Sequence, residues 1–170
     1  MRGSAEPAVQ PSVCLPEALA ATAAPLRVCG RVFQCDTIYL GAHVMIGYMI
    51  LGTNDLPRAR AFYDALLAEM GVARMMEFGE RGSAWAAAMD KPMLCIMTPY
   101  DGRPATVGNG VMAGIAVESR ATVDRMHRKA LELGGADEGA PGLRGEGGEG
   151  FYAAYFRDLD GNKLDVYCYG

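Results

Sequence analysis

The sequence predicts an α+β fold made of two copies of a β-α-β-β-β module. In each half, an apolar strand leads into a capped amphipathic helix, which short strands then follow. When the chain is shifted by 64 residues, Phe62 falls on Met126, Leu66 on Ala130 and Leu67 on Leu131. Near the C-terminus, Asp160-Gly161 is a strong tight-turn signal between two further strands. Together these observations predict two similar modules, with a mixed sheet on one side and helices on the other.

The first module is expected over residues 45–98. Residues 45–52 form an apolar strand, and Thr53-Asn54-Asp55 supplies a helix N-cap with Pro57 in the first turn. From Ala59 to Met70 apolar residues recur at helical spacing, and Gly71 ends the helix. Three more strands are predicted at 73–78, 83–89 and 92–98.

The second module is expected over residues 111–169, after a linker of residues 99–110. An apolar strand spans 111–117, Ser119 caps the second helix and Gly134-Gly135 ends it. Strands are then predicted near 136–138, at 151–157 and at 163–169.

Composition excludes several classes of protein. The chain has 170 residues, of which 51% are hydrophobic and 21% charged, and this suits one globular domain. Its net charge of −4 leaves no excess of cations for phosphates, so nucleic acid is not expected as a main partner. Residues 37–54 carry no Asp, Glu, Lys or Arg, but their glycines and the helix start that follows argue against a membrane span.

Residues 1–44 differ from the rest of the chain. They hold three of the five cysteines and four prolines, without a sustained hydrophobic period. We interpret them as an N-terminal extension, either disordered or left by an expression tag that the opening MRGS resembles, before a domain of residues 45–170. The odd number and irregular spacing of the cysteines, and the lack of a secretory signal, predict a reduced cytoplasmic protein.

Two segments carry a resemblance to a known family. NDLPRARAFYD (54–64) follows the first strand, and FYAAYFRDLDGNKLDVY (151–167) contains the strand–turn–strand end of the chain. Over 45–170 the sequence resembles the vicinal oxygen chelate superfamily, which includes glyoxalase I, extradiol dioxygenases, and fosfomycin and bleomycin resistance proteins. The resemblance implies a cup-shaped mixed sheet with the helices outside, and a homodimer. It also implies that enzymes of this kind hold a divalent metal in the cup with ligands from the first and fourth strands of each module.

The metal positions that this resemblance implies carry unsuitable residues here. They are Tyr48, Cys95, Met112 and Asp165. Met112 offers only a soft thioether, and Tyr48 would have to lose a proton whose intrinsic pKa is near 10. Neither histidine helps, because His43 precedes the first strand and His127 lies on the second helix. We therefore expect no metal and no other cofactor, with a divalent metal as the alternative.

Strand alternation predicts what lines the cup instead. The four positions above are joined on the same face by Ile46, Ile50, Met93, Met97, Ala116 and Tyr167. The opposite, helix-facing set is apolar throughout: Met49, Leu51, Leu94, Ile96, Ala113, Ile115, Leu164 and Val166. Trp85 either adds to the lining or belongs to the core. A methionine-rich lining with two phenols and one acid suits a small organic ligand with a polar handle.

Asp165 is the one candidate catalytic residue. It is either functional, as a hydrogen-bond acceptor or general base, or paired with Lys163 two residues away. We interpret the chain as a glyoxalase-like protein that binds a small organic molecule without metal, as the drug-binding relatives do. One alternative is a metal-dependent lyase or isomerase of the glyoxalase I type; another is a structural dimer module with a filled cup. Whether the chain is an enzyme stays open.

Overall fold

The computed structural model describes residues 26–28, 31–33, 45–145 and 150–170. The chain divides into two units, residues 1–40 and 41–170. The first unit contains an antiparallel hairpin of β1 (Leu26–Val28) and β2 (Arg31–Phe33). The sequence did not predict this hairpin, because strands of three residues are too short to show alternation. The remainder of the expected extension lies outside the described residues.

The second unit contains both predicted modules. In the first module, β3 (Tyr48–Gly52) leads to α1 (Leu56–Ala68), β4 (Ala73–Glu77), a 3-10 turn (Gly79–Arg81), β5 (Gly82–Ala86) and β6 (Met93–Met97). The second holds β7 (Ala113–Ala116), α2 (Arg120–Glu132), β8 (Ala136–Leu143), β9 (Phe151–Arg157) and β10 (Lys163–Tyr169). Only β8 is much longer than predicted. Gly139 and Gly142 lie at irregularities in its pairing with β9, and they obscure the strand pattern in the sequence.

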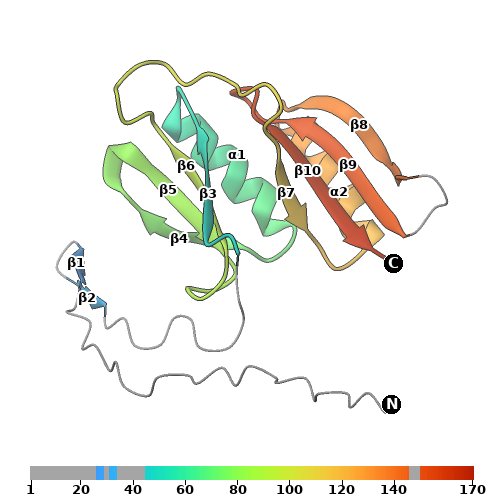
Figure 1. The fold of residues 1–170 in the computed structure, drawn as a ribbon, viewed down its shortest axis with the longest axis horizontal. Helices are drawn as coiled ribbons and strands as arrows, with labels where there is room; N and C mark the ends of the chain where they lie inside the picture. The colour runs from blue at the N-terminus through green and yellow to red at the C-terminus, as the bar shows by residue number, and fades with distance from the viewer. Residues whose placement is uncertain (1–25, 29–30, 34–44, 146–149) are drawn as a thin grey trace, which may run out of the picture. The chain divides into compact units, whose positions relative to one another are not determined.

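The two modules have the same strand order. The sheets run β3-β6-β5-β4 and β7-β10-β9-β8. In each sheet the first strand along the chain pairs in parallel with the last one along the chain, β3 with β6 and β7 with β10. Figure 1 shows α1 behind the first sheet and α2 behind the second. The strands therefore form two separate four-stranded sheets, whose inner edges are β3 and β7.

The caps and the core form as the sequence predicts. The Asp55 carboxylate accepts a hydrogen bond from the Arg58 backbone N–H (3.0 Å), and the Ser119 hydroxyl accepts one from the Thr122 N–H (3.3 Å). All eight residues predicted to face the helices belong to the core cluster or pack against it. This fixes the register, because a shift of one residue would turn that set outward.

A buried carboxylate joins the second module to the first. Asp158, at the start of the β9–β10 turn, is only 7% exposed. Its Oδ2 accepts hydrogen bonds from the Tyr63 hydroxyl of α1 (2.7 Å) and from Asn162 Nδ2 (2.8 Å). Its Oδ1 accepts from the backbone N–H groups of Asp160 (3.0 Å) and Asn162 (2.8 Å). Burial, followed by the nearby Asp158 charge, raises the pKa of Tyr63 well above its usual value, so the phenol stays a donor.

Asp160 and Asn162 add further bonds between the modules. Asp160 accepts from the Thr53 hydroxyl (2.7 Å) and from the Asn54 N–H (3.0 Å). Asn162 Nδ2 donates to the Gly52 carbonyl (2.9 Å) at the end of β3. The β9–β10 turn is thus fixed against the junction of β3 and α1.

Within the described part of the chain, no helix has the length and apolar character needed to cross a membrane. Residues 45–54 of the uncharged segment contain β3 (Tyr48–Gly52) and lead into α1. Residues 37–44 lie outside the described residues.

The Asp158 network predicts a large effect on stability. We expect Asp158→Ala to lower the free energy of unfolding by about 2–4 kcal/mol, because the buried Tyr63 hydroxyl and two backbone N–H groups lose their acceptor. Urea denaturation measures this change. The control is Asp101→Ala, which removes an exposed linker carboxylate that bonds only to Arg103. Equal stability of the two variants would contradict the prediction.

Candidate ligand-binding site

The face of each sheet opposite its helix is called the open face here. In the first module, Ile46, Tyr48 and Ile50 are 57%, 64% and 54% exposed on this face. Met93 and Met97 are half-buried beside them, and Cys95 is buried. The predicted lining residues of this module therefore share one apolar surface, which is not covered by a helix.

The four predicted metal positions occupy equivalent places in the two sheets. Cys95 pairs with Ile50, and Asp165 pairs with Gly114. Tyr48 and Met112 lie two residues before those partners. The repeat thus relates the two pairs as the sequence predicts.

Their chemistry does not fit a divalent metal of the kind the family's enzymes hold. Burial raises the pKa of the Cys95 thiol, which favours the neutral form over the thiolate that binds metals. Tyr48 is a largely exposed phenol and Met112 a thioether, so Asp165 is the only carboxyl among the four. Within the described residues no three His, Cys, Asp or Glu side chains cluster as a metal site would need. His127 lies on α2, where its Nε2 is 3.0 Å from Asp137 Oδ1, and His43 is outside the described residues.

Asp165 is a buried carboxyl without a full set of partners. The residue is 4% exposed, and its Oδ1 has no hydrogen-bond partner among the residues that the structure describes. Burial raises the pKa of Asp165, although a backbone hydrogen bond and the charge of Lys163 act in the opposite direction. The ion pair with Lys163, one of the two sequence-based alternatives, does not form. Lys163 Nζ instead lies 3.1 Å from Glu138 Oε2.

Gly114 lies next to both the free oxygen of Asp165 and the ring of Tyr167. A Cβ on Gly114 would lie 3.0 Å from Asp165 Oδ1 and 3.3 Å from Tyr167 Cε1. The absence of a side chain at Gly114 therefore gives the carboxyl and the phenol ring their space.

Beyond Asp165 the open face of the second sheet is aromatic. The ring centroids of Tyr167 and Tyr169 lie 5.2 Å and 5.3 Å from that of Phe151, and 5.9 Å from each other. Tyr169 is 76% exposed. We call these three residues the aromatic end; such spacings are typical of favourable ring pairs.

The opposite end of the same face is cationic. Arg157 Nε donates to Glu138 Oε1 (2.6 Å), and Lys163 donates to the other oxygen of the same carboxylate. Lys163 Nζ also lies 5.6 Å from the Tyr155 ring centroid, and Arg144 Cζ lies 5.3 Å from it. We call Arg157 and Lys163 the cationic end.

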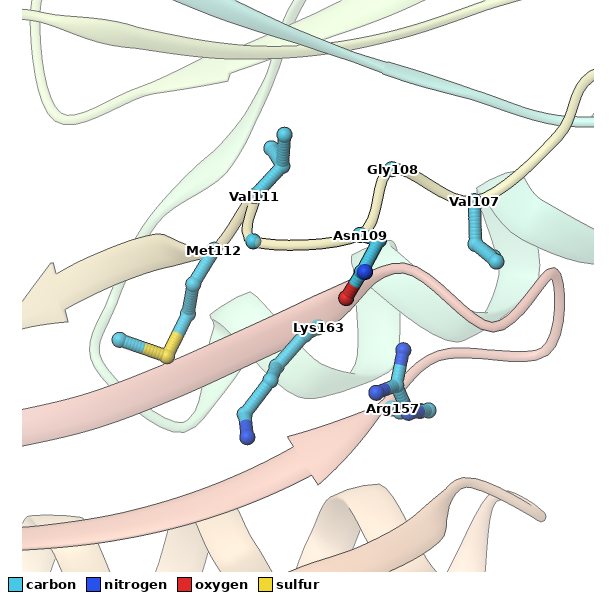
Figure 2. A pocket seen from close by; sticks show the side chains of 8 residues that line it. Val107, Gly108, Asn109, Val111, Met112, Arg157 and Lys163 are labelled. Atoms are coloured by element: carbon cyan, nitrogen blue, oxygen red, sulfur yellow. The ribbon is translucent and has the colours of Figure 1, made fainter.

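A pocket of about 410 Å³ opens at the cationic end. Its walls are linker residues 107–111, together with Met112, Arg157 and Lys163. Figure 2 shows the linker passing beside the two strands, with the side chain of Asn109 directed toward them. Met112 is the one predicted lining residue that borders this pocket.

A second pocket of about 560 Å³ lies at the C-terminal end of β6. Residues 98–100 and 102–104 form one wall, and Glu80, Arg81, Thr53 and Asn54 complete it. None of the predicted lining residues borders this pocket.

Trp85 does not belong to the open face. Its indole Nε1 donates to Asp64 Oδ1 (2.9 Å) of α1, and its ring centroid is 5.7 Å from that of Tyr63. It is 1% exposed within the core. Of the two positions that the sequence left open for Trp85, the structure shows the core.

The sequence analysis missed the cationic end and most of the aromatic end. Phe151, Tyr155 and Arg157 share the open face because β9 pairs residue by residue with β10, which places Arg157 opposite Lys163. Extending strand alternation from β10 to β9 could have found them.

Comparisons with known proteins agree on the family. The family model described as Glyoxalase/Bleomycin resistance protein/Dioxygenase superfamily matches residues 42–166. A glyoxalase/bleomycin resistance protein from Albidiferax ferrireducens T118 is 33% identical, with a TM-score of 0.66 over 74% of this chain and 99% of that one. A search of curated proteins finds no match.

More distant structures share the fold. A lactoylglutathione lyase from Agrobacterium tumefaciens is 21% identical, with a TM-score of 0.55 over 72% of this chain and 92% of that one. A family enzyme from Burkholderia phytofirmans PsJN is 15% identical, with a TM-score of 0.58 over 73% of this chain and 98% of that one. By its matched residues, its strand order and its 33% identical relative, this chain belongs to the glyoxalase/bleomycin resistance protein/dioxygenase superfamily.

Proposed function

We propose that this protein binds a small organic molecule on its open face and does so without a divalent metal. The observation that carries the proposal is the Asp165 carboxyl, which is buried between the cationic end and the aromatic end with one oxygen unpartnered among the described residues. A buried polar atom without a partner costs about 1–3 kcal/mol. A ligand that supplies the missing hydrogen bond would recover part of that cost.

Asp165 acts as the polar handle of this site. Its unpartnered Oδ1 can accept a hydrogen bond from a donor group of the ligand. The aromatic end supplies apolar contact for the rest of the ligand.

The first prediction concerns metal independence. We expect the neutral fluorescent probe N-phenyl-1-naphthylamine to bind equally well with EDTA and with added Ni²⁺, Zn²⁺ or Mn²⁺. Tyr167→Ala should weaken binding roughly three- to tenfold, since it removes a ring of the aromatic end. Tyr100→Ala removes a ring that is 89% exposed in the linker and is the matched control.

Elemental analysis of untagged protein separates this function from its alternatives. About one metal ion per chain, lost in Asp165→Ala, would contradict the proposal and restore a metal-dependent lyase or isomerase. If neither metal nor the probe binds, a structural module with a filled cup explains the fold better.

The buried carboxyl also predicts a pH dependence of stability. Because its folded pKa is raised, Asp165 favours folding most below its unfolded pKa of about 4, and that contribution is lost as pH rises through the folded pKa. Asp165→Asn should therefore gain stability over the wild type as pH rises from 4 toward neutrality, as measured by urea unfolding.

Asp137→Asn is the control of opposite sign for this experiment. A hydrogen bond from the Gly139 N–H, followed by one from His127, lowers the pKa of Asp137. That carboxylate stabilises the fold above its unfolded pKa, so its loss should cost more as pH rises. The same trend in both variants would argue against the Asp165 assignment.

We also propose that the protein is a homodimer. The exposed apolar side chains of Ile46, Tyr48 and Ile50 on the first sheet support this, since such clusters commonly mark interfaces. Light scattering should give about twice the chain mass of 18.1 kDa. Ile50→Lys should shift the protein toward monomer, whereas Tyr100→Lys in the exposed linker should not. A wild-type monomer at all concentrations would contradict the proposal.

A further inference from the structure

The open face of the second sheet changes character along its length. Arg157 pairs with Lys163 at one end, and Phe151 pairs with Tyr169 at the other. Asp165 lies between them, opposite Tyr155. At about 3.3 Å per residue, Lys163 and Tyr167 are roughly 13 Å apart along β10. This is the length of a small amphipathic molecule.

We propose that the ligand of this site is an organic anion, whose oxyanion group binds Arg157 and Lys163 in the linker pocket while its apolar part lies on the aromatic end. The proposal rests on the proposed function and names the ligand class. Carboxylate, phosphate and sulfonate groups share the chemistry that these two cations recognise.

The charges at the cationic end are incompletely balanced. Glu138 is the single acid that both Arg157 and Lys163 contact within the described residues. Arg157 Nη1 also donates a hydrogen bond to the Gly161 carbonyl (2.8 Å), which holds the guanidinium beside the turn. Lys163 has three donors, and one hydrogen bond to a side chain is found for it. Two cations against one carboxylate leave capacity for a second anion.

The linker forms the facing wall of the pocket. Within the described part of the chain, the backbone N–H groups of residues 107–111 form no hydrogen bond to another backbone group. Figure 2 shows Asn109 directed toward the strands that carry Lys163 and Arg157. Val107 lies close to the β9–β10 turn, since a Cβ on Gly161 would lie 2.9 Å from Val107 Cγ1. The pocket thus has two cations on one wall and the linker, with the polar Asn109, on the other.

The remaining residues of the face fit the same ligand. Asp165 lies two residues from Lys163 along β10, between the cationic end and the aromatic end. Arg144, on the far side of β9, lies over Tyr155 and adds to the positive potential. The pocket volume of about 410 Å³ is sufficient for the polar half of a small organic acid.

The experiment compares two probes that share one ring system. 1-Anilinonaphthalene-8-sulfonate carries an oxyanion, whereas N-phenyl-1-naphthylamine is neutral. Fluorescence titration of the full chain gives the dissociation constant of each. We expect the anionic probe to bind more tightly, and Lys163→Gln to weaken it about three- to tenfold while leaving the neutral probe unchanged. Lys163→Arg should keep the preference.

The control is Lys91→Gln, which removes the same charge from the β5–β6 turn, where Lys91 pairs with Asp90. It should alter neither probe. Added salt should weaken only the anionic probe. If both probes bind equally well, or if Lys91→Gln acts as strongly as Lys163→Gln, the anion site is wrong while ligand binding on the open face stands. If neither probe binds, the anion site and the proposed function are both wrong.

Discussion

The arrangement of the two modules depends on one buried carboxylate. Asp158 accepts hydrogen bonds from its own turn and from Tyr63 on α1, so folding of the β9–β10 turn and docking of the modules satisfy the same group. The cost of burying the charge is offset only when all these donors are present. The turn can therefore close fully only where the first module supplies the phenol.

The residues on either side of this turn belong to the candidate site. Arg157 immediately precedes Asp158, and Lys163 immediately follows Asn162. Their side chains point to the open face because strand alternation sends each to the side opposite its buried neighbour. Val107 lies close to Gly161 of the same turn and lines one pocket with the two cations. One short segment thus positions the module contact and the pocket together.

The sequence predicted the repeat, both helix caps and the two faces of the sheets because each depends on local periodicity. Asp55 and Ser119 cap as expected, and the eight helix-facing residues all reach the core. Less was predictable where pairing between distant residues decides the outcome. Lys163 pairs with Glu138, 25 positions away, rather than with its near neighbour Asp165. Trp85 is in the core because Asp64 of α1 accepts its N–H, and no spacing in the sequence specifies that partner.

The open face and the core face of each sheet differ in which amino-acid substitutions they tolerate. Core residues are constrained by packing from the helices, whereas an open-face residue can change without disturbing that packing. This separation lets the fold persist with Tyr48, Cys95 and Met112 at the positions where the family resemblance implies metal ligands. Asp165 is different, because a buried carboxyl with an unpartnered oxygen destabilises the fold that carries it. An apolar residue would be the more stable choice beside Tyr167. A ligand of the kind proposed above would complete the hydrogen bonds of this carboxyl and offset part of its cost.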